Sequence, residues 1–211
     1  NVFADGVDPA LVEILKKTDD KGRRAQLIEI LERRRATGAA SALLGELTSE
    51  DGHVRRRALA ALGTVAGPGE VPGMIAALLK IQDGGERDDA ERAIAAVCAR
   101  TADESQRAEP VLAVFDPAAP ADQVTLLPML GRIGGAKVLD LVRAAIAGSD
   151  PARRAAGEKA LCNWPDSTAV EDLAKLAESS SDRDVKIRAI HALARTVNQP
   201  PAHAEEAKLD L

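Results

Sequence analysis

A twelve-residue pattern recurs along the chain and constrains its fold more than any other feature. Its clearest copy, 51–62, reads DGHVRRRALAAL: an Asp opens it, and Val54, Ala58, Ala61 and Leu62 follow at helical spacing. Asp is a strong N-cap, and its charge suits the positive end of a helix. Three further stretches place an Asp eleven residues before a closing Leu: 20–31, 150–161 and 182–193. Each copy therefore predicts the start of an α-helix.

The closing apolar position sets the period of the repeat. We place it at Leu31, Leu62, Val97, Leu130, Leu161 and Leu193, in steps of 31 to 35 residues. The copies at 86–97 and 119–130 are degenerate, and the second of them has lost its opening Asp. A Gly- or Pro-rich turn and a second, shorter apolar run follow each copy, which predicts six units of helix, turn and helix.

These motifs resemble the HEAT-repeat family in its short bacterial form. The resemblance rests on D-x-x-V-R-x-x-A-x-x-A-L at 51–62 and its near-copies, and on L-G-x-V/I-G/A-G at 62–67 and 130–135. It implies an all-α, right-handed α-α superhelix (an armadillo-like α-solenoid) of about six HEAT-like hairpins, with the second helices on the concave side. We expect this solenoid over 1–198 and, over 199–211, a linker and the onset of a further, truncated helix. The resemblance also implies a fragment of a larger multidomain protein.

The repeated charged positions have two interpretations, a structural one and a charged binding track. Repetition in register favours N-caps and a ladder of charge-assisted hydrogen bonds between adjacent repeats. The HEAT-repeat resemblance implies the same use. The residues concerned are Asp20, Arg24, Asp51, Arg55, Asp150, Arg154, Asp182 and Lys186.

A basic region near the start of the chain is the candidate for partner contact. Residues 21–57 hold nine Lys and Arg against five Asp and Glu, whereas the whole chain has a net charge of −5. Such asymmetry steers an anionic partner, although solvated helix faces also carry charge runs. The candidate contact residues are Arg33, Arg34, Arg35, Arg56 and Arg57.

Composition disfavours several other functions. A sequence pI near 5.3 and only three aromatic residues disfavour nucleic-acid binding. The sequence has no apolar run long enough to insert into a membrane. The three histidines are dispersed without metal-ligand spacing, and no phosphate-loop or nucleophile motif is present, so we expect no metal, cofactor or catalytic residue. Cys98 and Cys162 lie two repeats apart, which predicts free, buried thiols.

The sequence therefore favours a non-catalytic protein-protein interaction or scaffold module with a concave helical surface. Its partner would be another protein or a neighbouring domain of the same parent chain. The alternative is a HEAT-like enzyme component that resembles a bilin lyase or, less well, a DNA glycosylase. A DNA glycosylase would need aromatic residues in a basic groove. The sequence leaves two locations open: the cytoplasm, or export with the signal peptide trimmed. Partner, binding face and oligomeric state are also open.

Overall fold

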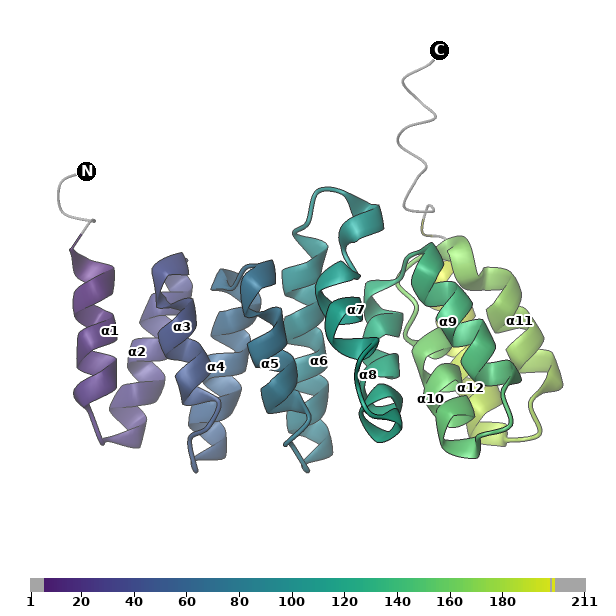
Figure 1. Cartoon of the computed structure of the whole chain (residues 1–211), viewed down its shortest axis with the longest axis horizontal. Helices are drawn as coiled ribbons and strands as arrows, with labels where there is room; N and C mark the ends of the chain where they lie inside the picture. Colours follow the sequence, from purple (N-terminus) through teal and green to yellow (C-terminus); the bar gives the residue numbers. More distant parts are fainter. Residues whose placement is uncertain (1–5, 198, 200–211) are drawn as a thin grey trace, which may run out of the picture. The chain divides into compact units, whose positions relative to one another are not determined.

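The structure is a computed structural model that describes residues 6–197 and 199. Over these residues the regular structure consists of twelve α-helices and four short 3-10 turns, without a strand (Figure 1). The all-α solenoid fold predicted from the repeats is confirmed. The helices fall into two compact units, one ending at Thr101 and the other beginning at Ala102, and each unit is a stack of helical hairpins.

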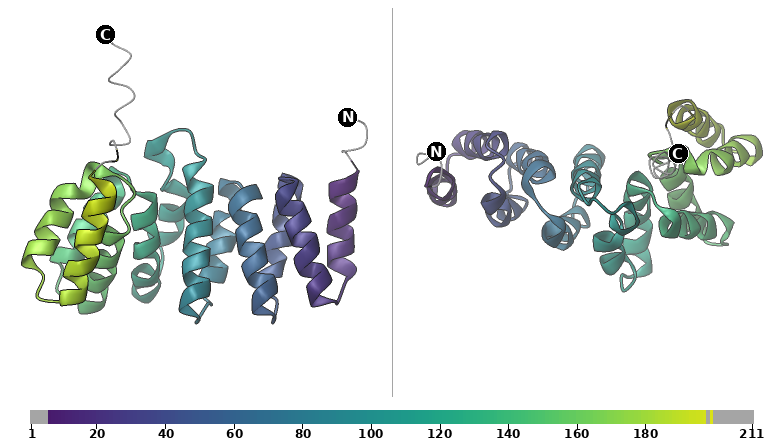
Figure 2. Two further views of the ribbon diagram at one scale, coloured as in Figure 1. Left: turned by 180° about the vertical axis from the view of Figure 1, so that it is seen from behind. Right: turned by 90° about the horizontal axis from the view of Figure 1, so that it is seen from above.

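The first unit contains three hairpins. Their first helices, α1, α3 and α5, each pack on the following second helix, and α2 packs on α4, which packs on α6. The second helices stand side by side when the unit is viewed from behind (Figure 2). The helices are α1 Val7–Lys17, α2 Lys21–Arg33, α3 Ala40–Glu46, α4 Gly52–Val65, α5 Val71–Leu78 and α6 Gly84–Ala99.

The second unit repeats the arrangement. Here α8 packs on α10 and α10 on α12, and each of these second helices contacts the first helix of its own hairpin. The helices are α7 Glu109–Phe115, α8 Pro120–Ile133, α9 Ala136–Ala147, α10 Pro151–Cys162, α11 Val170–Ser179 and α12 Arg183–Thr196. One continuous array over 1–198 stays a prediction, and the linker and helix onset predicted for 199–211 lie outside the described residues, Gln199 apart.

The stacking depends on residues without large side chains. A Cβ on Gly63 of α4 would lie 3.3 Å from the Cα of Ala93 in α6. A Cβ on Gly131 of α8 would lie only 2.6 Å from the Cα of Ala160 in α10, closer than any Cβ can approach. Leu, Ile and Ala side chains fill the remaining core. Backbones that approach this closely explain how the chain packs without a large aromatic core.

The structure corrects the predicted register of the third repeat. Asp83, not Glu86, opens this copy, because its carboxylate accepts from the Glu86 N–H at 2.8 Å and α6 begins at Gly84. The closing position is therefore Ile94 rather than Val97, which restores the eleven-residue spacing. A copy that opened at Glu86 would leave Gly84 and Gly85 in the preceding turn, whereas both lie in the first turn of α6. First-turn N–H groups have no intrahelical partner, so glycine costs less there than in a helix interior.

A second correction concerns the start of the first helix. The Asp8-Pro9 pair is typical of an N-cap and a first helical residue, but α1 begins at Val7 after Gly6, without a side-chain cap. The Asp8 carboxylate instead accepts a hydrogen bond from the guanidinium of Arg34, at the end of α2. The expected turn glycines Gly134 and Gly135 do have positive φ, 78° and 99°, between α8 and α9.

Candidate interaction surfaces

Every second helix whose repeat keeps the Asp is capped by it. The Asp20 carboxylate accepts from the N–H of the third residue after it at 2.6 Å. Asp51, Asp150 and Asp182 each accept from the second and third following N–H groups, at 2.7–3.3 Å. These bonds satisfy donors that an α-helix leaves free at its start. These carboxylates are therefore occupied by hydrogen bonds at the starts of their own helices.

The arginine four residues after each cap closes the loop before its own helix. In four repeats its guanidinium donates to the carbonyl oxygen six residues earlier, which belongs to that loop. These bonds are Arg24 to Thr18 at 3.3 Å, Arg55 to Ser49 at 2.7 Å, Arg87 to Ile81 at 2.7 Å and Arg154 to Gly148 at 2.8 Å. Lys186, at the same position of the sixth repeat, has no hydrogen bond or ion pair to a described residue.

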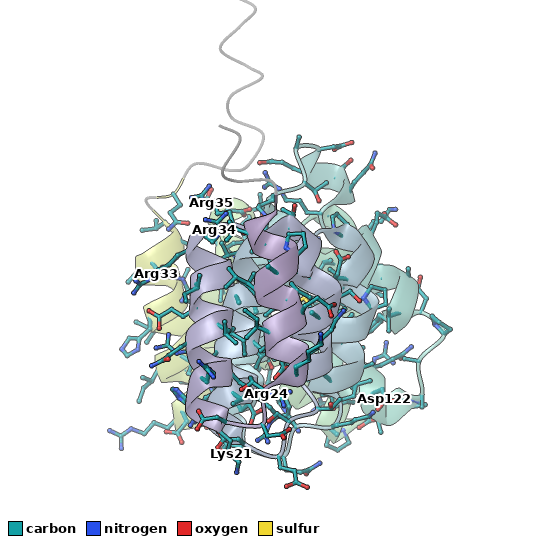
Figure 3. The ribbon with its side chains drawn as sticks, turned by 90° about the vertical axis from the view of Figure 1, so that its left-hand side faces the viewer. Lys21, Arg24, Arg33, Arg34, Arg35 and Asp122 are labelled. Atoms are coloured by element: carbon teal, nitrogen blue, oxygen red, sulfur yellow. The ribbon has the colours of Figure 1, made fainter. Side chains whose placement is uncertain are left out.

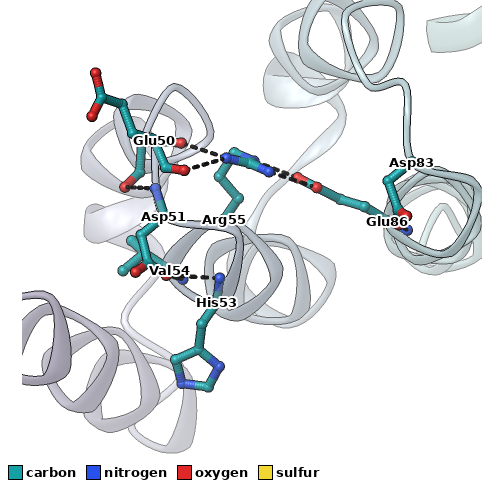
Figure 4. A network of polar contacts seen from close by, with 8 residues as sticks. Glu50, Asp51, His53, Val54, Arg55, Asp83 and Glu86 are labelled. Carbon is teal, nitrogen blue, oxygen red and sulfur yellow. Dashed lines mark hydrogen bonds and ion pairs between the residues drawn. The ribbon is translucent and has the colours of Figure 1, made fainter.

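Two of these arginines also reach the next repeat. Arg55 donates to both carboxylate oxygens of Glu86 in α6, at 2.6 and 2.8 Å (Figure 4). Arg24 donates in the same bidentate way to Glu46 in α3, at 2.9 and 2.7 Å. Glu46 and Glu86 are each only 5% exposed. The hydrogen bonds from these buried carboxylates raise the pKa of both guanidinium groups, so both arginines stay charged.

Sequence reasoning missed both acidic partners. Glu86 stands three residues after a capping Asp, so the correct register of the third repeat would have placed it at the start of α6. Glu46 lies at the end of a first helix, 22 residues from Arg24, and no repeated residue type marks it. A third link, from the Lys21 ammonium to the Asp51 carboxylate at 3.8 Å, also joins α2 to α4.

Polar side chains also join the C-terminal ends of the second helices. Arg100 donates to the carbonyls of Gly63 and Ala66 at the end of α4. Arg195 donates to those of Cys162 and Trp164 at the end of α10, at 2.9 and 3.1 Å. These carbonyls have no intrahelical partner, and a cation there complements the helix dipole. The two arginines stand at different distances from their caps, so no sequence period revealed them.

The five candidate contact arginines divide between the two ends of their helices. Arg33, Arg34 and Arg35 lie at the end of α2 opposite Lys21 and Arg24 (Figure 3). Arg56 and Arg57 lie in the first turns of α4. Since helices rise about 1.5 Å per residue, the two groups stand roughly 12 Å apart along the helix direction. The basic region of the sequence is therefore two separate clusters.

Acidic neighbours engage three of these five arginines. Arg33 bonds Glu29 at 2.5 Å, Arg57 lies 3.6 Å from the same carboxylate, and Arg34 bonds Asp8. The other two, Arg35 and Arg56, are exposed, and their guanidinium groups make no hydrogen bond or ion pair to a described residue. Only these two are available as cations for a partner.

Arg56 also lines a hollow between α4 and α6. The hollow has a volume of about 370 Å³, and small residues form most of its lining. On the α6 side, Arg92 is paired with Asp88 and with Asp89, the latter at 2.6 Å. The lining residues are Arg56, Ala60, Gly63, Thr64, Asp89, Arg92, Ala93 and Ala96.

A family model described as HEAT repeats matches residues 9–95. Over these residues the chain carries HEAT repeats. The match falls on the hairpins of the first unit, and the second unit repeats their order of helices. No curated protein matches the chain.

Similar solved structures include a designed armadillo repeat protein, at 18% identity over 89% of this chain and 98% of that one, with a TM-score of 0.40. The complex of CpcE and CpcF of phycocyanin lyase from Nostoc sp. PCC7120 matches at 14% identity over 89% and 98%, with a TM-score of 0.41. An archaeal HEAT-like repeats protein from Thermococcus onnurineus NA1 matches at 15% over 88% and 77%, with a TM-score of 0.39.

The other reactive residue types of the described chain are buried or scattered. Cys98 and Cys162 are free and buried, as predicted, and burial raises the pKa of both thiols, to about 11 for Cys98. Trp164 is fully buried, and its indole N–H donates to the Thr168 hydroxyl at 2.9 Å. Within 6–197 and 199, no three His, Cys, Asp or Glu side chains gather closely enough to hold a metal ion. No described helix is long and apolar enough to cross a bilayer.

Proposed function

We propose that this HEAT-repeat chain is a non-catalytic protein-interaction module, and that its partner binds the row of second helices in the first unit. The observation that carries the proposal is the hollow between α4 and α6, with the unpaired cation of Arg56 on its edge. Repeat solenoids bind through the extended surface that successive helices form.

The lining of the hollow indicates what would fit it. Ala60, Gly63, Ala93 and Ala96 leave a space that their own side chains do not fill. A modest apolar side chain of a partner can occupy this space. A carboxylate next to it can pair with Arg56, since Asp89, the acidic residue of the same hollow, is paired with Arg92. The partner is therefore a protein segment that presents an apolar and an acidic side chain together.

The other charges support a binding module rather than a catalyst. Arg24 and Arg55 hold loops and neighbouring helices together, and the buried thiols with raised pKa are poor nucleophiles. Of the five arginines in the sequence hypothesis, Arg56 is the proposed principal contact and Arg35 a secondary one. A neighbouring domain of a longer parent chain and a separate protein would meet the same surface.

The test is capture of partner proteins from an extract of the source organism by the immobilised chain, with binding quantified for defined variants. Arg56→Glu reverses the proposed contact charge, and Ala60→Leu fills the hollow. Lys80→Glu is the matched control, because Lys80 is an exposed cation in the turn after α5 and does not line the hollow. We expect each of the first two changes to weaken capture at least tenfold and the control to leave it unchanged.

Two outcomes would count against the proposal. Capture that ignores both Arg56→Glu and Ala60→Leu would move the binding surface elsewhere. A visible chromophore that co-purifies with the chain and transfers to an acceptor protein would contradict a non-catalytic role and support the bilin-lyase alternative. Absorption spectra of the purified chain, recorded before and after incubation with the captured protein, distinguish the two.

A further inference from the structure

Inside each stack, neighbouring second helices pack on each other through the same positions. Counted from the N-cap residue, position twelve of one helix meets position ten of the next, as Gly63 meets Ala93 and Gly131 meets Ala160. Position ten is buried in every second helix that follows another within its unit. These residues are Ala61, Ala93, Ala160 and Ala192.

The last described helix exposes the half of this junction that a following helix would cover. Position eight, which is buried as Ile28, Leu59 and Leu127 in other second helices, is Ile190 in α12, and it is 54% exposed. Ala194, at position twelve, is exposed too, and it is spaced i+4 from Ile190, so the two residues share one face of α12. Ile187 is 41% exposed, but it stands at position five, which is exposed in α10 as well, as Ala155.

Helix α2, the second helix of the first hairpin, exposes the other half of such a junction. Its residue at position ten is Ile30, which is 42% exposed, whereas the residues at this position in α4, α6, α10 and α12 are buried. No described helix precedes the hairpin of α1 and α2 on that side. Isolated exposed apolar residues need no explanation, but Ile190 and Ile30 occupy positions that are buried in most of the other second helices.

We propose that these two surfaces bind each other between copies of the chain, so that α12 of one copy packs on α2 of a second copy. Ala194 at position twelve would meet Ile30 of the second copy at position ten. This pairing places one small residue, Ala194, at the closest approach, where the internal contacts place two. This self-association is independent of the function proposed for the α4–α6 hollow.

Charge supports this occupant. Inside the first unit, Lys21, the residue after one cap, faces Asp51, the cap of the next helix, at 3.8 Å. In α12 the residue after the cap is Arg183, and the cap of α2 is Asp20, so the proposed contact repeats the attraction. A symmetric contact between two parallel α12 helices would instead bring Arg183 against the Arg183 of the other copy, which disfavours it.

The contact joins two different surfaces, so it does not close on itself. Heterologous contacts of this kind add copies at both ends unless a rotation closes a ring. We expect the weight-average mass of the chain, 22.1 kDa as a monomer, to rise steadily in sedimentation equilibrium between about 10 µM and 1 mM without a plateau at the dimer.

Two end-blocked variants test the geometry. Ile190→Glu disables the α12 surface, and Ile30→Glu disables the α2 surface. Each variant alone should remain monomeric over that range, whereas a mixture should form a 1:1 dimer that does not grow, because each variant retains the surface that the other lacks. Ala155→Glu, on the exposed side of α10, is the control and should associate like the unmodified chain.

Several results would overturn the inference. An unmodified chain that stays monomeric up to about 1 mM would exclude a contact of measurable strength. Association that survives Ile30→Glu but not Ile190→Glu would indicate the symmetric α12 contact instead. Circular dichroism confirms that each variant is folded. Should a variant unfold, Ile190→Ser or Ile30→Ser replaces it, and the same mixing result is required.

Discussion

Arg55 holds Glu86 across the junction between α4 and α6 with two hydrogen bonds, of 2.6 and 2.8 Å, while its remaining nitrogen holds the carbonyl of Ser49 at 2.7 Å. One side chain thus fixes the loop before its own helix and the start of the next repeat (Figure 4). The partner carboxylate is buried, so its charge depends on this guanidinium for compensation.

The first prediction concerns this pair. Arg55→Ala should lower the free energy of unfolding by about 2 kcal/mol, because it leaves the Glu86 carboxylate buried without its charged donor. Urea unfolding followed by circular dichroism measures the change. Arg56→Ala, at the exposed neighbouring position, is the control and should stay within about 0.5 kcal/mol. Adding Glu86→Gln to Arg55→Ala should restore part of the loss, and a fully additive double variant would contradict the pairing.

The second prediction concerns the pH dependence of an N-cap. Hydrogen bonds from the Val54 N–H and then the His53 N–H hold the pKa of Asp51 below its ordinary value of 3.8, and the Lys21 ammonium adds to this. The fold therefore favours the charged form, and this stabilisation is present above the ordinary pKa and is lost as the pH falls through the lower folded value.

Comparison with Asp51→Asn isolates this effect. Asn keeps the capping oxygen but carries no charge. The native chain should therefore have the higher urea midpoint at pH 7, and the difference should shrink as the pH falls below about 4. A difference that is the same at pH 7 and pH 3 would show that the charge of Asp51 contributes nothing. An NMR titration of the Asp51 carboxyl group checks the direction of its pKa shift directly.

The third prediction concerns the buried thiols. Burial raises the pKa of Cys98 from 9.0 to about 11, so at pH 8 its thiolate fraction falls roughly a hundredfold. Alkylation by iodoacetamide, read by mass spectrometry of peptides, should be at least that much slower in the native chain than in urea. Cys162 should be slowed too, since burial also raises its pKa. Rapid labelling of either thiol in the native chain would mean that its hairpin opens readily.

What the sequence predicted and what it missed follow from the range of the interactions. The Asp51 cap is a contact within four residues, so a local pattern reveals it. The start of α6 was misplaced because Gly84 and Gly85 favour a turn in isolation, whereas the Asp83 cap and the packing of α6 on α4 outweigh that preference.

Contacts between repeats were harder to predict, because the acidic partners need not share a repeat position. Arg55 reaches 31 residues ahead to a second helix, but Arg24 reaches 22 residues ahead to a first helix. The basic cluster also looked continuous in sequence. The structure places Arg33 in the last turn of α2 but Arg56 near the start of α4, and it pairs Arg33 with Glu29. Only three-dimensional placement shows which cations remain available.

The last prediction concerns the closest approach of two helices in the second unit. Gly131→Ala adds a Cβ that would lie 2.6 Å from the Ala160 Cα, and a backbone atom cannot rotate away as a side chain can. We expect a loss of about 3 kcal/mol, at the upper end of the cost of overpacking. Gly45→Ala is the matched control, since no neighbouring atom lies within 4 Å of its Cβ and alanine favours helix by about 0.5–1 kcal/mol. The buried indole of Trp164, the only Trp of the chain, reports unfolding of this unit through the red shift of its fluorescence. An unchanged fluorescence midpoint for Gly131→Ala would mean that α8 and α10 can separate at no cost, and the tight stacking described for this unit would then be wrong.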